Sequence, residues 1–169
     1  MESLEKQLQK CDPDKVKLIV TDGVFSMEGD LANLPAIVRL KKKYNATIMV
    51  DEAHGIGVFG KNGRGVCDHF GLTSEVDLIM GTFSKSLASI GGFIAADETI
   101  INWLRHNART YIFSASNTPA ATACAREALH ILQQEPERIK ALWDVTDYAL
   151  KQFRAAGFEI GETESPIIP

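Results

Sequence analysis

The segment that decides the fold runs from residue 47 to 54 and reads Thr-Ile-Met-Val-Asp-Glu-Ala-His. Its first four residues, 47–50, are typical of a buried strand, and the carboxylates of Asp51 and Glu52 and the imidazole of His54 follow them. The same change from apolar to polar occurs on both sides of it: residues 16–21 (Val-Lys-Leu-Ile-Val-Thr) lead into Asp22-Gly23, and residues 76–80 (Val-Asp-Leu-Ile-Met) lead into Gly81-Thr82. The sequence therefore predicts three neighbouring strands, each followed by polar residues.

Segments with helical spacing lie between and beyond these strands. Helices are predicted over 1–11, 35–44, 98–107, 118–133 and 137–156, and further strands over 92–96 and 111–113. Strands that alternate with helices and are apolar throughout indicate an α/β layer, in which helices cover both faces of a mostly parallel sheet. Ligands of such sheets bind beyond the carboxyl ends of the strands, so the polar residues there are the candidates for a site.

Composition restricts the classes of protein to consider. The chain has 169 residues, 45% of them apolar and 24% charged, which is typical of a globular protein with a sizeable core. A net charge of −4 argues against binding nucleic acid by neutralising phosphates, and no apolar run is long enough to span a bilayer. Cys11, Cys67 and Cys124 are few and far apart, which predicts neither a disulfide framework nor a metal site and favours the cytoplasm.

Two glycine motifs point to a nucleotide but lack its other requirements. Residues 55–60 fit G-x-G-x-x-G, and residues 55–61 fit G-x-x-x-x-G-K. A dinucleotide site needs a helix directly after the glycines, which 61–65 is not predicted to begin, and a phosphate loop needs Ser or Thr where Asn62 stands. A nucleotide-binding α/β module stays a lower-ranked alternative. So does a non-catalytic subunit, against which the intact Lys85 argues.

Asp51, His54 and Lys85 together suit pyridoxal 5'-phosphate (PLP). A lysine that follows a strand, with hydroxyls at Thr82 and Ser84, can form a Schiff base with an aldehyde beside a bound phosphate. A carboxylate at a neighbouring strand end can keep a pyridine nitrogen protonated, and an imidazole can hydrogen-bond the phenolic oxygen of the ring. Each residue alone is more often structural, but their joint placement on successive strand ends favours the cofactor.

Four blocks, in order, give the chain a specific resemblance to the α-oxoamine synthases, which are fold-type I PLP enzymes. They are 21–30 (TDGVFSMEGD), 50–60 with 63–65 (VDEAHGIGVFG and GRG), 81–87 with 91–92 (GTFSKSL and GG), and 111–116 (YIFSAS). The resemblance implies the large domain of such an enzyme: a mostly parallel sheet with flanking helices.

The resemblance also implies a role for each matching residue. Lys85 would hold the cofactor and later move protons at the α-carbon of the amino acid, Asp51 would pair with the ring nitrogen, and Thr82 and Ser84 would bind the phosphate. His54 and Ser26 would contact the ring oxygen O3'. Ser114 to Ser116 would reach the cofactor of the other subunit of a homodimer; Ala115 replaces a residue that is often Thr, so this contact passes to Ser116 or to backbone.

The implied reaction is a decarboxylative condensation of an amino acid with an acyl-CoA. The lysine block, 82–86 with 91–93, is most similar to bacterial serine palmitoyltransferases, which favours L-serine and palmitoyl-CoA as substrates and 3-ketosphinganine as product. Glycine C-acetyltransferase (2-amino-3-ketobutyrate CoA ligase) and 8-amino-7-oxononanoate synthase activities remain open.

Complete enzymes of this family have roughly 400 residues by resemblance, so the chain is interpreted as a fragment. Residues 1–134 would be the C-terminal part of the PLP-binding large domain. Residues 135–169 would begin a small α+β C-terminal domain, with 164–169 starting a strand. Groups that stack on the ring and hold the substrate carboxylate would lie elsewhere, so we expect the 169 residues alone to be inactive or nearly so.

Overall fold

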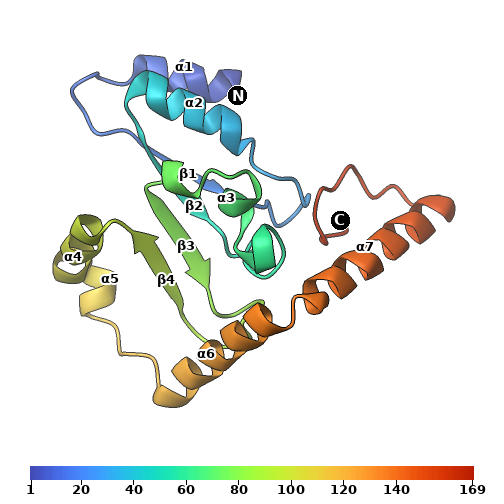
Figure 1. Cartoon of the computed structure of the whole chain (residues 1–169). Helices are drawn as coiled ribbons and strands as arrows, with labels where there is room; N and C mark the ends of the chain where they lie inside the picture. The colour runs from blue at the N-terminus through green and yellow to red at the C-terminus, as the bar shows by residue number, and fades with distance from the viewer.

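The computed structural model describes all residues, 1–169, and contains one four-stranded sheet. Its strands are β1 (Leu18–Asp22), β2 (Thr47–Asp51), β3 (Leu78–Thr82) and β4 (Gly92–Ala96), in the order β1-β2-β3-β4. The first three pair in parallel, and β4 runs antiparallel to β3 (Figure 1). The predicted α/β layer with a mostly parallel sheet is confirmed.

Seven helices accompany the sheet, and the five predicted ones are present within two residues of their expected bounds. They are α1 (Glu2–Lys10), α2 (Leu34–Tyr44), α3 (Val66–His69), α4 (Glu98–Asn107), α5 (Arg109–Ile112), α6 (Pro119–Gln134) and α7 (Glu137–Ala155). Two short 3-10 turns are η1 (Lys61–Gly63) and η2 (Thr73–Glu75). Both α2 and α6 begin with a capping side chain, Asn33 or Thr118, and a proline in the first turn.

The main core lies between one face of the sheet and the helices α1 and α2. Alternate strand residues point to this face, and Ile19, Ile48 and Val50 pack there against apolar side chains of the two helices. The opposite face is exposed at β1, where Leu18 and Val20 keep 55% and 60% of their surface. The prediction that helices cover both faces is thus wrong at β1, because no helix of this chain lies over that side.

Two of the predicted strands are wrong. Residues 111 and 112 are the last two of the short helix α5, and Phe113 follows it. The N–H groups of Tyr111 and Ile112 donate to the Ala108 carbonyl. Aromatic and β-branched residues favour a strand only where they pair with a neighbouring strand, and this segment is not one of the four strands of the sheet. Residues 164–169 are also irregular, since Pro166 and Pro169 have no N–H to donate to a ladder.

The two long helices, α6 and α7, lead the chain away from the sheet, and the segment after α7 returns toward it. Figure 1 shows α6 crossing near the end of β3, α7 continuing outward, and the C-terminal segment returning toward the loop after β1. The indole Nε1 of Trp143 on α7 donates to the Val58 carbonyl at 3.1 Å, which holds this helix against the loop after β2. None of the helices has both the length and the apolar character needed to cross a membrane. The domain boundary at 134/135 stays a prediction.

Candidate active site

The ends of the strands meet at one edge of the sheet, as the sequence predicted. In the parallel register Asp22 lies opposite Asp51, and Asp51 lies opposite Met80. Strand β1 extends one residue beyond its predicted segment and β3 extends two, because backbone pairing continues into the polar residues that follow. The antiparallel strand β4 begins at this edge, with Gly92 opposite Thr82. Polar side chains that end β1, β2 and β3, and the backbone at the start of β4, therefore lie at the same edge.

Asp51 and His54 occupy a tight turn at the end of β2. The Oδ1 atom of Asp51 accepts a hydrogen bond from the Ala53 N–H at 2.8 Å, which fixes the carboxylate and leaves Oδ2 without a partner in the chain. The N–H groups of Gly55 and Ile56 both donate to the Glu52 carbonyl, so the turn is closed by backbone bonds. Both Asp51 and His54 are half-buried. This geometry presents an oriented carboxylate and an imidazole at the same strand end.

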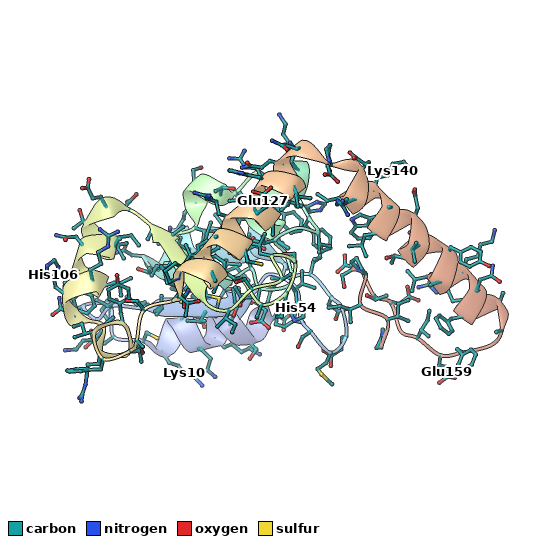
Figure 2. The ribbon with its side chains drawn as sticks, turned by 90° about the horizontal axis from the view of Figure 1, so that it is seen from below. Lys10, His54, His106, Glu127, Lys140 and Glu159 are labelled. Atoms are coloured by element: carbon teal, nitrogen blue, oxygen red, sulfur yellow. The ribbon has the colours of Figure 1, made fainter.

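The electrostatic environment of His54 links it to the other candidates. Burial lowers the pKa of its imidazole, and the positive charge of Lys85 lowers it further, while the Asp22 and Asp51 carboxylates act in the opposite direction. The ring is therefore neutral at neutral pH. Figure 2 shows His54 near the middle of the molecule, whereas His106 on α4 and Glu159 beyond α7 lie toward opposite ends.

Lys85 lies in a loop that is closed on itself by hydrogen bonds. Thr82 Oγ1 lies 2.9 Å from Ser84 Oγ and donates to the Gly91 carbonyl at 3.1 Å. The Phe83 N–H donates to the same carbonyl at 2.8 Å. Lys85 is exposed, and its amine makes no hydrogen bond or ion pair within the chain. The loop thus presents a free amine beside two clustered hydroxyls.

A hydrogen bond joins the loop of Lys85 to the turn of His54. Ser86 Oγ donates to the Ile56 carbonyl at 2.8 Å, and a Cβ atom on Gly57 would lie only 2.6 Å from the Ser86 Cβ. Sequence reasoning assigned no role to Ser86. It also missed Glu52, whose position next to Asp51 on an alternating strand signals a side chain on the opposite, covered face.

Ser26 and Ser116 are less closely joined to this group. Ser26 lies exposed in a turn after β1, where the Gly29 N–H donates to the Phe25 carbonyl, and no hydrogen bond connects it to His54. Ser116 lies exposed after α5 and lines a hollow of about 680 Å³ together with Gly91 and Gly92. It is therefore near the loop of Lys85 but outside the hydrogen-bonded cluster.

The glycine-rich segment after His54 does not form a nucleotide site. Residues 55–60 lead into the 3-10 turn η1 and not into a helix, and α3 begins only at Val66 and has four residues. The backbone N–H groups of Gly57 and Gly65 bond back to the carbonyls of Gly63 and Phe59. These groups hold the loop together, so they are not directed at a phosphate.

The whole chain, residues 1–169, matches the family model described as aminotransferase class I and II. The chain belongs to this family. The α-oxoamine synthase resemblance is also confirmed, because serine palmitoyltransferases from Bacteroides ovatus and Bacteroides thetaiotaomicron are each 85% identical to it over 169 residues. An 8-amino-7-oxononanoate synthase from Petrotoga mobilis is 52% identical over an alignment of 171 residues.

Solved structures agree with this assignment. A Sphingomonas wittichii serine palmitoyltransferase matches 99% of the chain with a TM-score of 0.92 and 37% identity, and a serine palmitoyltransferase solved with PLP matches equally well at 38% identity. The fold is thus part of a fold-type I PLP transferase. The chain spans about two-fifths of these relatives: 43% of each Bacteroides protein and 42% of each of the two structures.

Proposed function

We propose that the full-length protein is a PLP-dependent acyltransferase that condenses L-serine with palmitoyl-CoA and releases 3-ketosphinganine, free CoA and carbon dioxide. The observation that carries the proposal is the convergence of Asp51, His54 and Lys85 on one sheet edge, with a Ser86–Ile56 hydrogen bond between their loops. The 85% identity to two serine palmitoyltransferases supports this choice of substrates.

The donor set at this edge fits PLP. The free amine of Lys85 can hold an aldehyde, and the Ser84 hydroxyl beside Thr82 can donate to a phosphate. Thr82 would join it by turning its hydroxyl away from the Gly91 carbonyl. The free Oδ2 of Asp51 can accept from a protonated ring nitrogen, because Oδ1 is already held by the Ala53 N–H. When bound, PLP supplies an electron sink that stabilises negative charge at the α-carbon of the amino acid.

Each residue then has a defined task. Lys85 would take the proton from the α-carbon of serine and return it, and Asp51 would keep the ring nitrogen protonated. The neutral His54, together with Ser26, would hydrogen-bond the phenolic oxygen of the ring. Ser116 would contact the phosphate held by the other subunit of a homodimer. The homodimer and the cytoplasmic location expected from the sequence remain part of this proposal.

The experiment is a product analysis on the full-length protein. We would supply PLP with L-serine, glycine or L-alanine against acyl-CoAs of several chain lengths and identify products by mass. We expect 3-ketosphinganine from serine and palmitoyl-CoA, and none from Lys85→Ala, whereas Lys61→Ala on the loop surface should keep the activity. A preference for alanine, or for glycine with a short acyl-CoA, would overturn the choice of substrates.

An 8-amino-7-oxononanoate synthase is the second candidate, favoured by the 52% identity to the Petrotoga mobilis enzyme. This activity would use the same residues in the same roles. The site therefore does not distinguish the two activities, and the product analysis does. Stabilisation by a nucleotide without PLP binding would instead favour the nucleotide-binding alternative.

A further inference from the structure

Glu52 is a buried carboxylate that the proposed reaction does not use. It keeps only 1% of its surface and has no cationic partner. Its Oε2 accepts from the Val66 N–H at 2.9 Å and its Oε1 from the Cys67 N–H at 2.7 Å. Removing a charge from water costs several kcal/mol unless hydrogen bonds replace the hydration, so this residue needs an explanation.

The space around Glu52 is shaped for a carboxylate. A Cβ atom on Gly55 would lie 1.9 Å from its Oε2, one on Gly65 would lie 2.7 Å from its Cδ, and one on Gly23 would lie 3.2 Å from its Oε2. The three glycines come from three segments: the end of β1, the turn after β2, and the start of α3. Because each approaches the carboxylate closely, Glu52 is the point at which these segments meet.

The backbone of Glu52 is held as firmly as its side chain. Its N–H donates to the Met80 carbonyl at 2.8 Å, and its carbonyl closes the turn that contains His54. Side chains alternate along an extended chain, so Asp51 and Glu52 point to opposite faces. A fixed Glu52 therefore sets the orientation of Asp51 on the open face and of His54 in the turn.

We propose that Glu52 is a positioning residue, whose bonds to Val66 and Cys67 hold Asp51 and His54 in the geometry that binds PLP. The inference rests on the proposed function. Loss of these bonds releases the turn from α3, so the carboxylate and the imidazole lose their common orientation. The expected consequence is weaker and less ordered PLP binding, in addition to any loss of stability.

The test compares two variants of the full-length protein. Glu52→Gln keeps the size of the side chain, but its NH₂ must face one of two backbone N–H donors. We expect the dissociation constant for PLP to rise roughly tenfold, as for the loss of one buried hydrogen bond to a charge. The circular dichroism of the bound cofactor should also weaken. Asp77→Asn is the control: Asp77 Oδ2 accepts from the Ile48 N–H at 2.7 Å near the other end of β2 and also pairs with Lys41.

The outcomes separate positioning from general stability. The proposal is supported if both variants lower the melting temperature and only Glu52→Gln changes the affinity and the dichroism. It is overturned if Glu52→Gln is destabilised like Asp77→Asn yet binds PLP as the wild type does. If Glu52→Gln does not fold, Glu52→Asp, which keeps the charge but is one methylene shorter, takes its place with the same criteria. If the wild type itself shows no PLP-dependent visible band, the proposed function fails, and with it the role of Glu52.

Discussion

The hydroxyl of Ser86 and the carbonyl of Ile56, thirty residues apart in the chain, form a 2.8 Å hydrogen bond at the edge of the sheet. Ser86 directly follows Lys85, and Ile56 lies two residues after His54. The bond therefore sets the distance between two loops that otherwise belong to different strands. The fold therefore fixes the positions of the Lys85 amine and the His54 imidazole relative to each other.

Replacement of Ser86 by alanine tests that relationship. Because the bond is exposed, its loss should cost about 1 kcal/mol, which corresponds to a several-fold weaker affinity for PLP. Spectrophotometric titration of the full-length protein measures this change. Ser89→Ala is the control, because Ser89 Oγ in the same loop donates to the Ala121 carbonyl of α6. Equal effects of both variants would show that the loop as a whole matters and that the Ser86–Ile56 bond has no special role.

The pKa of His54 predicts a dependence of stability on pH. Burial and the charge of Lys85 lower this pKa in the folded protein below the unfolded value of about 6.5. Above both values neither state binds the proton, and His54 contributes nothing. As the pH falls through about 6.5 the unfolded state takes up a proton that the folded state does not, so stability decreases.

We expect His54→Gln, in the cofactor-free full-length protein, to lose less stability than the wild type between pH 7.5 and 5. Urea unfolding at several pH values measures this difference. Gln134→Ala at the end of α6, which removes no titratable group, is the control and should follow the wild-type profile. If the stability of His54→Gln depended on pH as that of the wild type does, the lowered pKa of His54 would be contradicted.

The sequence predicted the site better than it predicted the supporting contacts. Asp51, His54 and Lys85 could be placed together because parallel strands bring their carboxyl ends to one edge, a rule that needs only the strand pattern. The Ser86–Ile56 bond and the burial of Glu52 depend on which segments touch across 14 to 30 residues. Strand alternation places Glu52 on the covered face, but no local pattern specifies Val66 and Cys67 as its partners, or Ile56 as the partner of Ser86. The strand expected at 111–113 failed for the same reason, because these residues bond to nearby carbonyls in helical turns and not to another strand.

The segment 163–167 folds onto the turn that follows β1, and Gly29 lies at the contact. A Cβ on Gly29 would lie 2.1 Å from Thr163 Oγ1 and 2.9 Å from Ser165 Oγ, and the residue has a φ of +76°. Gly29→Ala should therefore combine backbone strain with a clash. Gly157→Ala supplies the strain alone, since its φ is +83° and nothing lies within 4 Å.

We expect Gly29→Ala to be destabilised by about 1–3 kcal/mol more than Gly157→Ala, as for overpacking in a well-packed site. Urea unfolding of the two variants gives the difference directly. Equal losses would mean that the segment 163–167 yields without cost and does not hold the turn that carries Ser26.

Asp51 and Asp22 lie opposite each other on neighbouring strands, yet only Asp51 is assigned to the ring nitrogen. Asp51→Asn can keep the bond to the Ala53 N–H through its amide oxygen, so the variant removes the charge and preserves the geometry. We expect kcat at saturating PLP to fall by roughly a hundredfold, as for the loss of one preorganised electrostatic contact. Asp22→Asn should change kcat far less, because Asp22 is not assigned a contact with the ring and acts on the site only through its charge near His54. A larger loss from Asp22→Asn would reverse the assignment.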